Sequence, residues 1–315
     1  MEYDKKIALI KAGDEVQGFF LLKDASVKQA ASGRPYLSGK LADASGEADF
    51  KFWDYAGTLE NEDCPVVKAR VKAEQYRGQI QLNVEKIRIA TAEDSYSLND
   101  LVPTAPIDSF AELEYIHQLV ETIEDEDYRM ICERMLDKHI VSFAKIPAAK
   151  MMHHSFLSGL LMHTANMLRI ADYLSGIYPD AVDRSLLLAG TLLHDICKDK
   201  EYSCSQFGLI KDMTVEGMLI GHLVMGAEEV GDIGRSLGIS AEKVMLLKHM
   251  ILSHHGQPEY GAAVKPCIAE SEMLAYIDML DSRMEMYAES FEKTNVGTFS
   301  EKNVPGLDKK IYNHE

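Results

Sequence analysis

The residues best suited to chemistry in this sequence are a cluster of histidines with an aspartate beside one of them. Of the 11 histidines, eight fall between positions 153 and 255, a stretch that holds about a third of the chain. His194 and Asp195 are adjacent in the apolar run Leu-Leu-His-Asp-Ile-Cys. Burying this pair is costly unless something binds both side chains. Imidazole and carboxylate together suit Mn²⁺, Fe²⁺, Co²⁺ or Zn²⁺, so the sequence predicts a divalent-metal site.

Further candidate ligands flank this pair at long intervals. They are His163, His222, His254, His255 and either Asp278 or Asp281. Such gaps are expected when several helices each contribute one or two ligands to a common core. A lone buried histidine is more often a hydrogen-bonded core residue than a ligand. We therefore interpret three histidines elsewhere in the chain as incidental, namely His117, His139 and His314. His249 is expected on the exposed side of its helix.

The elements that position these residues change type along the chain. Residues 14 to 90 predict short strands separated by turns such as Gly33-Arg34-Pro35. Within Glu47–Asp54, alternation places Phe50 and Phe52 on one face and Lys51 and Trp53 on the other. Five strands in about 75 residues are typical of a small OB-type barrel.

From Phe110 onward the apolar residues recur with a helical period. Helices are expected near 110–123, 128–140, 157–174, 184–197, 223–236, 241–253 and 268–290, and the 184–197 segment is apolar nearly all round, as in a central buried helix. The predicted organisation is a barrel domain over 1–94, a linker over 95–108 and an all-helical domain over 109–315. The fold class is thus a small all-β OB-type barrel followed by an all-α metal-binding domain.

Composition narrows the class of protein. With 46% hydrophobic and 26% charged residues, the chain resembles an ordinary soluble protein. It has no apolar run long enough to span a bilayer and no Cys-x-x-Cys among its five cysteines. Because no long apolar stretch follows the first residues, we expect no secretory leader. We expect a cytoplasmic protein without membrane association. The net charge is −17, but residues 1–95 hold 14 basic and 16 acidic residues, so the acidic excess belongs to the helical part.

Aromatic and basic residues interleave along the predicted barrel, which is typical of single-stranded nucleic-acid binding. Tyr36 and Trp53 are the best candidates for stacking on bases. Lys51 shares the face of Trp53, and Arg34 lies at the entry to the second strand. Most aromatic residues of a small barrel are core residues, however, and a barrel that only docks another chain remains an alternative.

The order His…His-Asp…His…His-His…Asp resembles the HD superfamily of metal-dependent phosphohydrolases. The resemblance implies one metal on a minimal set of four residues, namely His163, His194, Asp195 and Asp278, and it favours Asp278 over Asp281. The additional His222, His254 and His255 resemble the subset that holds two ions, with Asp195 bridging. The implied cofactors are two divalent ions, with Mn²⁺ preferred over Co²⁺, Fe²⁺ or Zn²⁺, and the implied chemistry is two-metal activation of water.

A second resemblance covers nearly the whole chain. The run His-His-Ser-Phe-Leu-Ser-Gly-Leu-Leu-Met-His-Thr at 153–164, Phe52-Trp53-Asp54 and Gly306-Leu307-Asp308 are similar to the YhaM-type 3′→5′ exoribonucleases. The resemblance implies an enzyme that shortens single-stranded RNA, and single-stranded DNA is a further candidate substrate. Whether the chain forms a homo-oligomer is left open.

Two more residues are candidates for catalysis beside Asp195. Lys198 follows the His-Asp pair by one helical turn and could meet a phosphate or a carboxylate. His154, like its neighbour His153, could donate a hydrogen bond to a substrate phosphate. The alternatives are an HD phosphohydrolase acting on a nucleotide or cyclic dinucleotide with a regulatory barrel, a nucleic-acid-binding protein without activity, and a di-iron oxygenase.

Overall fold

The structure, a computed structural model, describes residues 2–55, 57, 59, 64–148, 156–205 and 207–314. The chain divides into two compact units. The barrel unit comprises Met1–Thr104 and Ser205–Phe207, and the helical unit comprises Ala105–Cys204 and Gly208–Glu315. The main division, between Thr104 and Ala105, falls inside the predicted linker.

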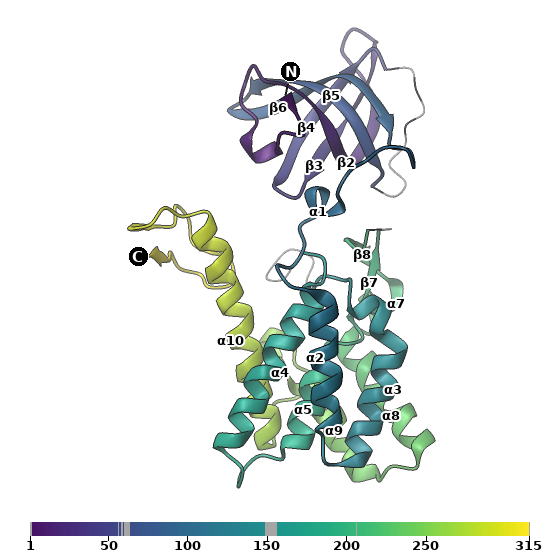
Figure 1. The fold of residues 1–315 in the computed structure, drawn as a ribbon, viewed down its shortest axis with the longest axis vertical. Helices are drawn as coiled ribbons and strands as arrows, with labels where there is room; N and C mark the ends of the chain where they lie inside the picture. Colours follow the sequence, from purple (N-terminus) through teal and green to yellow (C-terminus); the bar gives the residue numbers. More distant parts are fainter. Residues whose placement is uncertain are drawn as a thin grey trace. The chain divides into compact units, whose positions relative to one another are not determined.

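The barrel unit is built on one sheet. Its strands are β1 (Glu2–Tyr3), β2 (Glu15–Gln29), β3 (Pro35–Asp43), β4 (Gly46–Trp53), β5 (Val66–Tyr76) and β6 (Gln79–Ile89). The order is β1-β2-β3-β4-β6-β5, and β5 also pairs with β2, so that β2 to β6 form a closed five-stranded barrel (Figure 1). The β4–β6 pair is parallel, whereas its neighbours in the barrel are antiparallel. This is the OB-type architecture that the sequence predicts.

Alternation of side chains fills the barrel, because successive residues of a strand point to opposite faces. Along β5 the inward residues are Val67, Ala69, Val71 and Ala73, all of them buried. In β4, Phe50 is buried while Trp53 is 46% exposed. Strand β2 is long, because a bulge between Lys23 and Ser26 lets its pairing with β3 resume.

The helical unit contains one long run of helices. They are α2 (Ser109–Glu121), α3 (Glu126–Phe143), α4 (Gly159–Ile177), α5 (Arg184–Leu193), α6 (Lys198–Glu201), α7 (Val215–Leu219), α8 (His222–Leu237), α9 (Ala241–Ser253) and α10 (Ala269–Glu292). Two small hairpins, which the sequence did not predict, add β7 (Tyr202–Cys204) with β8 (Ile210–Met213) and β9 (Thr298–Phe299) with β10 (Tyr312–Asn313). Among the described residues, none of the helices has the length and apolar character that a membrane span requires.

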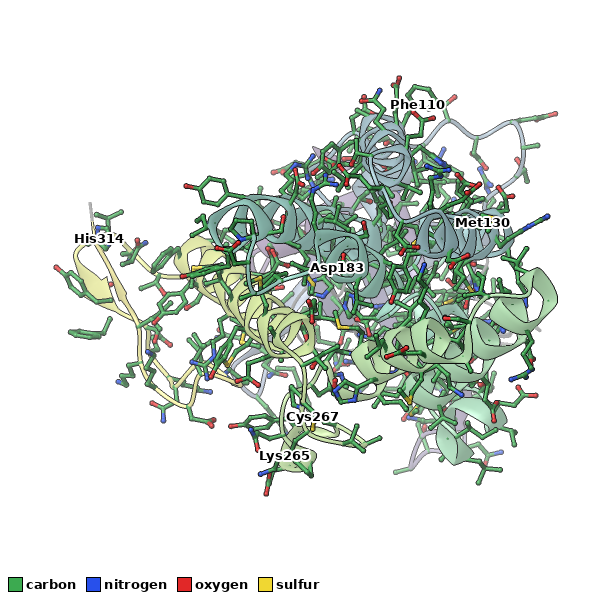
Figure 2. The ribbon with its side chains drawn as sticks, turned by 90° about the horizontal axis from the view of Figure 1, so that it is seen from below. Phe110, Met130, Asp183, Lys265, Cys267 and His314 are labelled. Carbon is green, nitrogen blue, oxygen red and sulfur yellow. The ribbon has the colours of Figure 1, made fainter. Side chains whose placement is uncertain are left out.

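Helix α5 is the centre of the helical unit. Asp183 caps it by accepting hydrogen bonds from the backbone N–H groups of Ser185 and Leu186. Every residue from Ser185 to Leu193 is buried. In the view from below of Figure 2, Asp183, where α5 begins, is near the middle of the picture, with Phe110 of α2 and Met130 of α3 further out. The sequence thus predicts the core helix correctly.

The end of α5 differs from the prediction of a helix reaching residue 197. The helix stops at Leu193, and the chain turns before α6 begins at Lys198. His194 is the C-cap residue, and its Nδ1–H donates to the carbonyl oxygen of Thr191 at 2.7 Å. Carbonyls in the last turn of a helix lack an intrahelical partner, so the imidazole satisfies one of them.

Candidate metal centre

Helix ends deliver most of the predicted ligands. His194 caps the C-terminus of α5, Asp195 follows it, and His222 is the first residue of α8. His254 caps the C-terminus of α9 and is followed by His255. His163 and Asp278 lie inside α4 and α10. Segments far apart in the sequence therefore meet, as a site built between helices requires.

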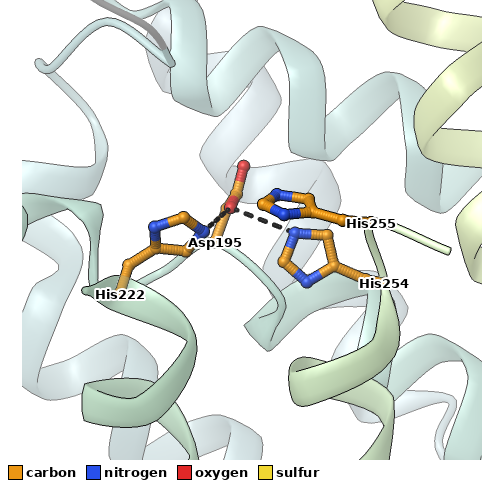
Figure 3. A group of neighbouring side chains, drawn as sticks. All are labelled: Asp195, His222, His254 and His255. Atoms are coloured by element: carbon orange, nitrogen blue, oxygen red, sulfur yellow. Dashed lines mark ion pairs between the residues drawn. The ribbon is translucent and has the colours of Figure 1, made fainter. Parts of the chain in front are cut away.

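Asp195 lies between two groups of histidines. Its Oδ1 is 3.2 Å from His222 Nε2 and 3.5 Å from His254 Nε2, as the dashed lines of Figure 3 mark. Its Oδ2 is 3.3 Å from His194 Nε2. Two sets of possible ligand atoms lie within 4.8 Å of one another, one made of Asp195, His222, His254 and His255, the other of His163, His194 and Asp195. Asp195 belongs to both sets.

Several polar atoms that face this centre lack hydrogen-bond partners. Among the described residues, the unpartnered buried atoms here are His194 Nε2, His222 Nε2, His254 Nε2, His255 Nδ1 and Asp195 Oδ1. Buried polar atoms normally have partners, so five such atoms converging on one place point to a missing ligand. Imidazole nitrogens and a carboxylate oxygen are donors that bind first-row divalent metals. The residues present therefore fit the metal ions that the sequence predicts.

The outward nitrogens of three of these imidazoles, those of His194, His222 and His254, are engaged in hydrogen bonds. His254 Nδ1–H donates to the carbonyl oxygen of Ile251 at 2.8 Å, as His194 does to Thr191. His222 Nδ1 lies 3.0 Å from each carboxylate oxygen of Glu201. Metal-binding histidines almost always donate their second N–H to a carbonyl or a carboxylate, which fixes the tautomer and aims the other nitrogen at the metal.

The structure separates the two aspartates that the sequence left as alternatives. Asp281 Oδ2 is 2.7 Å from His163 Nδ1, the nitrogen that corresponds to the outward position in the other histidines. Asp278 Oδ1 is 3.4 Å from the opposite nitrogen, His163 Nε2. Asp278 and Asp281 thus lie at opposite nitrogens of His163. Burial lowers the pKa of His163, but these carboxylates outweigh it and raise the pKa to about 9.

The protonation states of His254, His255 and Asp195 suit metal binding. Burial lowers the pKa values of His254 and His255, which keeps both imidazoles neutral near pH 7, the form that binds a metal. Burial raises the pKa of Asp195, but the positive charge of Lys198 and the proximity of His194 outweigh it and hold that pKa well below its usual range. The carboxylate is therefore ionised and ready to bind a cation.

Of the additional residues predicted to take part in catalysis, the structure describes Lys198 but not His154. Lys198 Nζ lies 2.6 Å from Asp195 Oδ2, and the lysine side chain is only 12% exposed. Of the two partners considered for Lys198, a carboxylate is the one observed. His154 and His153 lie outside the described residues.

Sequence reasoning missed Glu201. Its carboxylate also accepts a hydrogen bond from the backbone N–H of His222 at 3.2 Å, so it holds both the ring and the start of α8. In the sequence it is one acidic residue in the charged run Lys-Asp-Lys-Glu, and nothing distinguishes it from an exposed glutamate. Only the position of α6 beside α8 shows its role.

The barrel unit brings its predicted nucleic-acid-binding residues into one aromatic cluster, made of Tyr36, Lys51, Trp53 and Tyr76. Tyr36 and Trp53 are cross-strand neighbours with ring centroids 4.9 Å apart. Lys51 Nζ lies 5.3 Å from the Trp53 ring and 5.2 Å from the Tyr76 ring. Exposed aromatic faces held beside a cation can stack on bases and bind phosphate.

One residue near this cluster and one residue within it differ from the sequence prediction of the nucleic-acid-binding surface. Arg34 forms an exposed ion pair with Asp54, with 3.8 Å between its Nη1 and the carboxylate, so its charge is partly neutralised. Tyr76, which the sequence did not single out, is 49% exposed beside Lys51. It belongs to the cluster because β6 lies between β4 and β5, which brings the end of β5 near Lys51 of β4. This strand order could not be predicted from the sequence.

Comparison with known proteins addresses both units. The family model described as the HD domain matches residues 160–283, a segment that contains all seven predicted ligands. The second OB-fold domain of replication protein A from Methanococcus maripaludis is 16% identical, covering 30% of this chain and 100% of that one, with a TM-score of 0.25. The OB domain of Ta0387 from Thermoplasma acidophilum is 16% identical, covering 31% and 93%, also with a TM-score of 0.25.

The fold and the match together define the class of protein. The OB-type assignment of the first unit depends on its closed barrel and strand order. The helical unit carries an HD domain, which indicates a metal-dependent phosphohydrolase. The His/Asp clusters of this unit are where a divalent metal could bind.

Proposed function

We propose that this protein is a metal-dependent 3′→5′ exoribonuclease that hydrolyses phosphodiester bonds of single-stranded RNA, and of single-stranded DNA as a further substrate. The observation that supports it most is the convergence of five buried, unpartnered donor atoms on Asp195 and its neighbours. The direction of shortening comes from the resemblance to YhaM-type enzymes. In this proposal the seven ligands are His163, His194, Asp195, His222, His254, His255 and Asp278.

Two ions are proposed because Asp195 belongs to both ligand sets. Divalent ions bound there would activate a water molecule and offset charge on the phosphoryl oxygens, and Mn²⁺ is the preferred ion. Lys198 keeps the shared carboxylate ionised and adds a positive charge beside it. Glu201 and Asp281 aim His222 and His163 through their outward nitrogens.

The barrel is proposed to hold the single strand. Tyr36 and Trp53 would stack on bases, which is tolerant of sequence because every base offers a flat face. Lys51 would bind the phosphate backbone beside them, and Arg34 would do so when it leaves Asp54. A near-neutral barrel is compatible with this role, because the acidic excess of the chain lies outside residues 1–95.

The direct test is digestion of a 5′-labelled single-stranded oligoribonucleotide with a panel of Mn²⁺, Co²⁺, Mg²⁺ and Zn²⁺. We expect a ladder of labelled products that shortens with time and needs a divalent ion. Asp195→Asn should abolish it, while Asp180→Asn, the same change at an exposed aspartate, should not. Turnover of nucleotides or cyclic dinucleotides without shortening of the oligomer would instead favour the alternative phosphohydrolase.

A further inference from the structure

His139, which the sequence suggested was incidental, is at the centre of a second buried cluster. It lies in α3 and is only 2% exposed. Its Nδ1 is 2.8 Å from Asp199 Oδ2, and its Nε2 is 2.9 Å from Glu229 Oε1. Ionised carboxylates only accept hydrogen bonds, so both ring nitrogens carry a hydrogen and the ring is an imidazolium. One side chain therefore ties three helices together, α3, α6 and α8.

The surrounding groups are charged and paired. Ser142 Oγ donates to Asp199 Oδ2 at 2.7 Å. Glu229 also pairs with Lys138 and with Lys200. Burial lowers the pKa of His139, but Asp199 and Glu229 outweigh it and raise the pKa to about 10. The pKa of Glu229 is lowered to about 2, because these cations outweigh the effect of its burial.

The same cluster could be considered a metal site, because His139, Cys197 and Glu229 place ligand atoms within 4.8 Å of one another. Two observations argue against it. Both nitrogens of His139 are already bonded to carboxylates. Two lysines already neutralise the glutamate, so an added dication would create an excess of buried positive charge. The cluster is a hydrogen-bonded ion network.

The network holds the segment that supports the metal centre. Helix α6 has only four residues, Lys198–Glu201, and a helix that short is not stable without tertiary contacts. Within α6, Asp199 is the residue that accepts a hydrogen bond from His139. Its neighbours in α6 reach the centre, Lys198 at Asp195 and Glu201 at His222. The other carboxylate of the network, Glu229, lies on α8, whose first residue is His222.

We propose that His139 is a positioning residue for the metal centre, which through Asp199 and Glu229 fixes α6 and α8 so that Lys198, Glu201 and His222 keep their places. The inference depends on the proposed metal-dependent function, but it concerns how the centre is held rather than what it hydrolyses. It predicts that disrupting a contact outside the ligand set changes metal binding on the His222 side.

The test uses the full-length His139→Asn protein, with His117→Asn as the matched control because His117 is an exposed histidine of the same unit. Co²⁺ binding is measured by equilibrium dialysis and by the visible absorption of the bound ion. We expect His139→Asn to bind one of its two Co²⁺ ions about 10- to 100-fold more weakly and to show an altered spectrum, as loss of outer support does. With an oligoribonucleotide, kcat should fall about tenfold or more while KM is unchanged, because the barrel is intact.

A second variant keeps the test decisive if His139→Asn folds poorly. Asp199→Asn preserves side-chain size and should weaken Co²⁺ binding in the same way, and the double variant should lose no more than the worse single variant. Co²⁺ affinity and spectrum like those of His117→Asn in either folded variant would overturn the positioning role. Failure of the unaltered protein to bind Co²⁺ or to shorten RNA would overturn the proposed function instead.

Discussion

Two histidine clusters lie in the same helical unit. They differ in how many nitrogens of each imidazole ring have a hydrogen-bond partner. In the metal centre, His194, His222 and His254 each have an engaged Nδ1 and an unpartnered Nε2. In the network, both nitrogens of His139 are bonded to carboxylates. The unpartnered Nε2 of these three imidazoles is available to a metal, whereas hydrogen bonds to carboxylates occupy both nitrogens of His139 and make it a structural cation. Burial alone does not distinguish them.

The strongest way to break this comparison is to remove the carboxylate shared by the two ligand sets. Asp195→Asn should reduce RNA hydrolysis on the order of 10³-fold or more, because charge stabilisation at the reacting phosphate is lost. The measurement is the rate of shortening of the labelled oligomer in Mn²⁺, with circular dichroism to check the fold. A rate within a few-fold of Asp180→Asn would show that Asp195 is not part of the reaction centre.

A change in the outer layer should weaken the centre without removing a ligand. Glu201→Gln should lower the affinity for one ion by about 10- to 100-fold, because an amide aims the His222 ring less firmly than a carboxylate. Isothermal titration with Mn²⁺ measures this. Glu216→Gln, on the exposed side of α7, is the matched control and should bind both ions normally.

A change in the barrel should leave both histidine clusters unaffected. Trp53→Ala should weaken binding of a single-stranded oligoribonucleotide about tenfold, because one stacking contact is lost. Fluorescence anisotropy measures the affinity, and Mn²⁺ binding should be unchanged. Tyr3→Ala, at an aromatic residue of the barrel unit that is 70% exposed, is the control. Equal RNA affinity of the two variants would remove the aromatic cluster from the proposed binding surface.

The smallest expected effect is on the pH dependence of the unfolding free energy, and it tests directly whether His139 of the network is an imidazolium. The pKa of His139 is raised from 6.5 to about 10, so its stabilisation is complete below about pH 6.5 and is lost as the pH rises toward 10. Between pH 7 and pH 10, the metal-free protein should lose unfolding free energy on the order of 1–2 kcal/mol more than His139→Asn does. Denaturant unfolding across this range measures it, and parallel curves for the two proteins would contradict an imidazolium.

The sequence predicted what depends on pattern and composition. Alternation in β4 placed Phe50 inside and Trp53 outside, and the apolar run before His194 predicted the buried helix α5. The seven proposed ligands were predicted because histidines cluster there and because their order resembles a known superfamily. Asp278 rather than Asp281 was chosen from that resemblance, and the two carboxylates lie at opposite nitrogens of His163.

The sequence could not predict what depends on contacts between distant segments. Glu201 and His139 owe their importance to α6, which packs beside α3 and α8 after a turn that the sequence assigned to a longer helix. His249, expected on an exposed face, is half-buried and accepts a hydrogen bond from the backbone N–H of Cys267 at 3.0 Å. Periodicity specifies which face of a helix is apolar, but not which polar residue meets another.

The most direct test of the metal centre is the number of Mn²⁺ or Co²⁺ ions retained per chain after dialysis, measured by elemental analysis on the unaltered protein and on Asp195→Asn. The geometry of the ligands predicts two ions per chain in the unaltered protein, and a loss of ions from Asp195→Asn at the same concentration. Retention of no ion by the folded unaltered protein, or of equal numbers by both proteins, would contradict a centre that shares Asp195 between two metals.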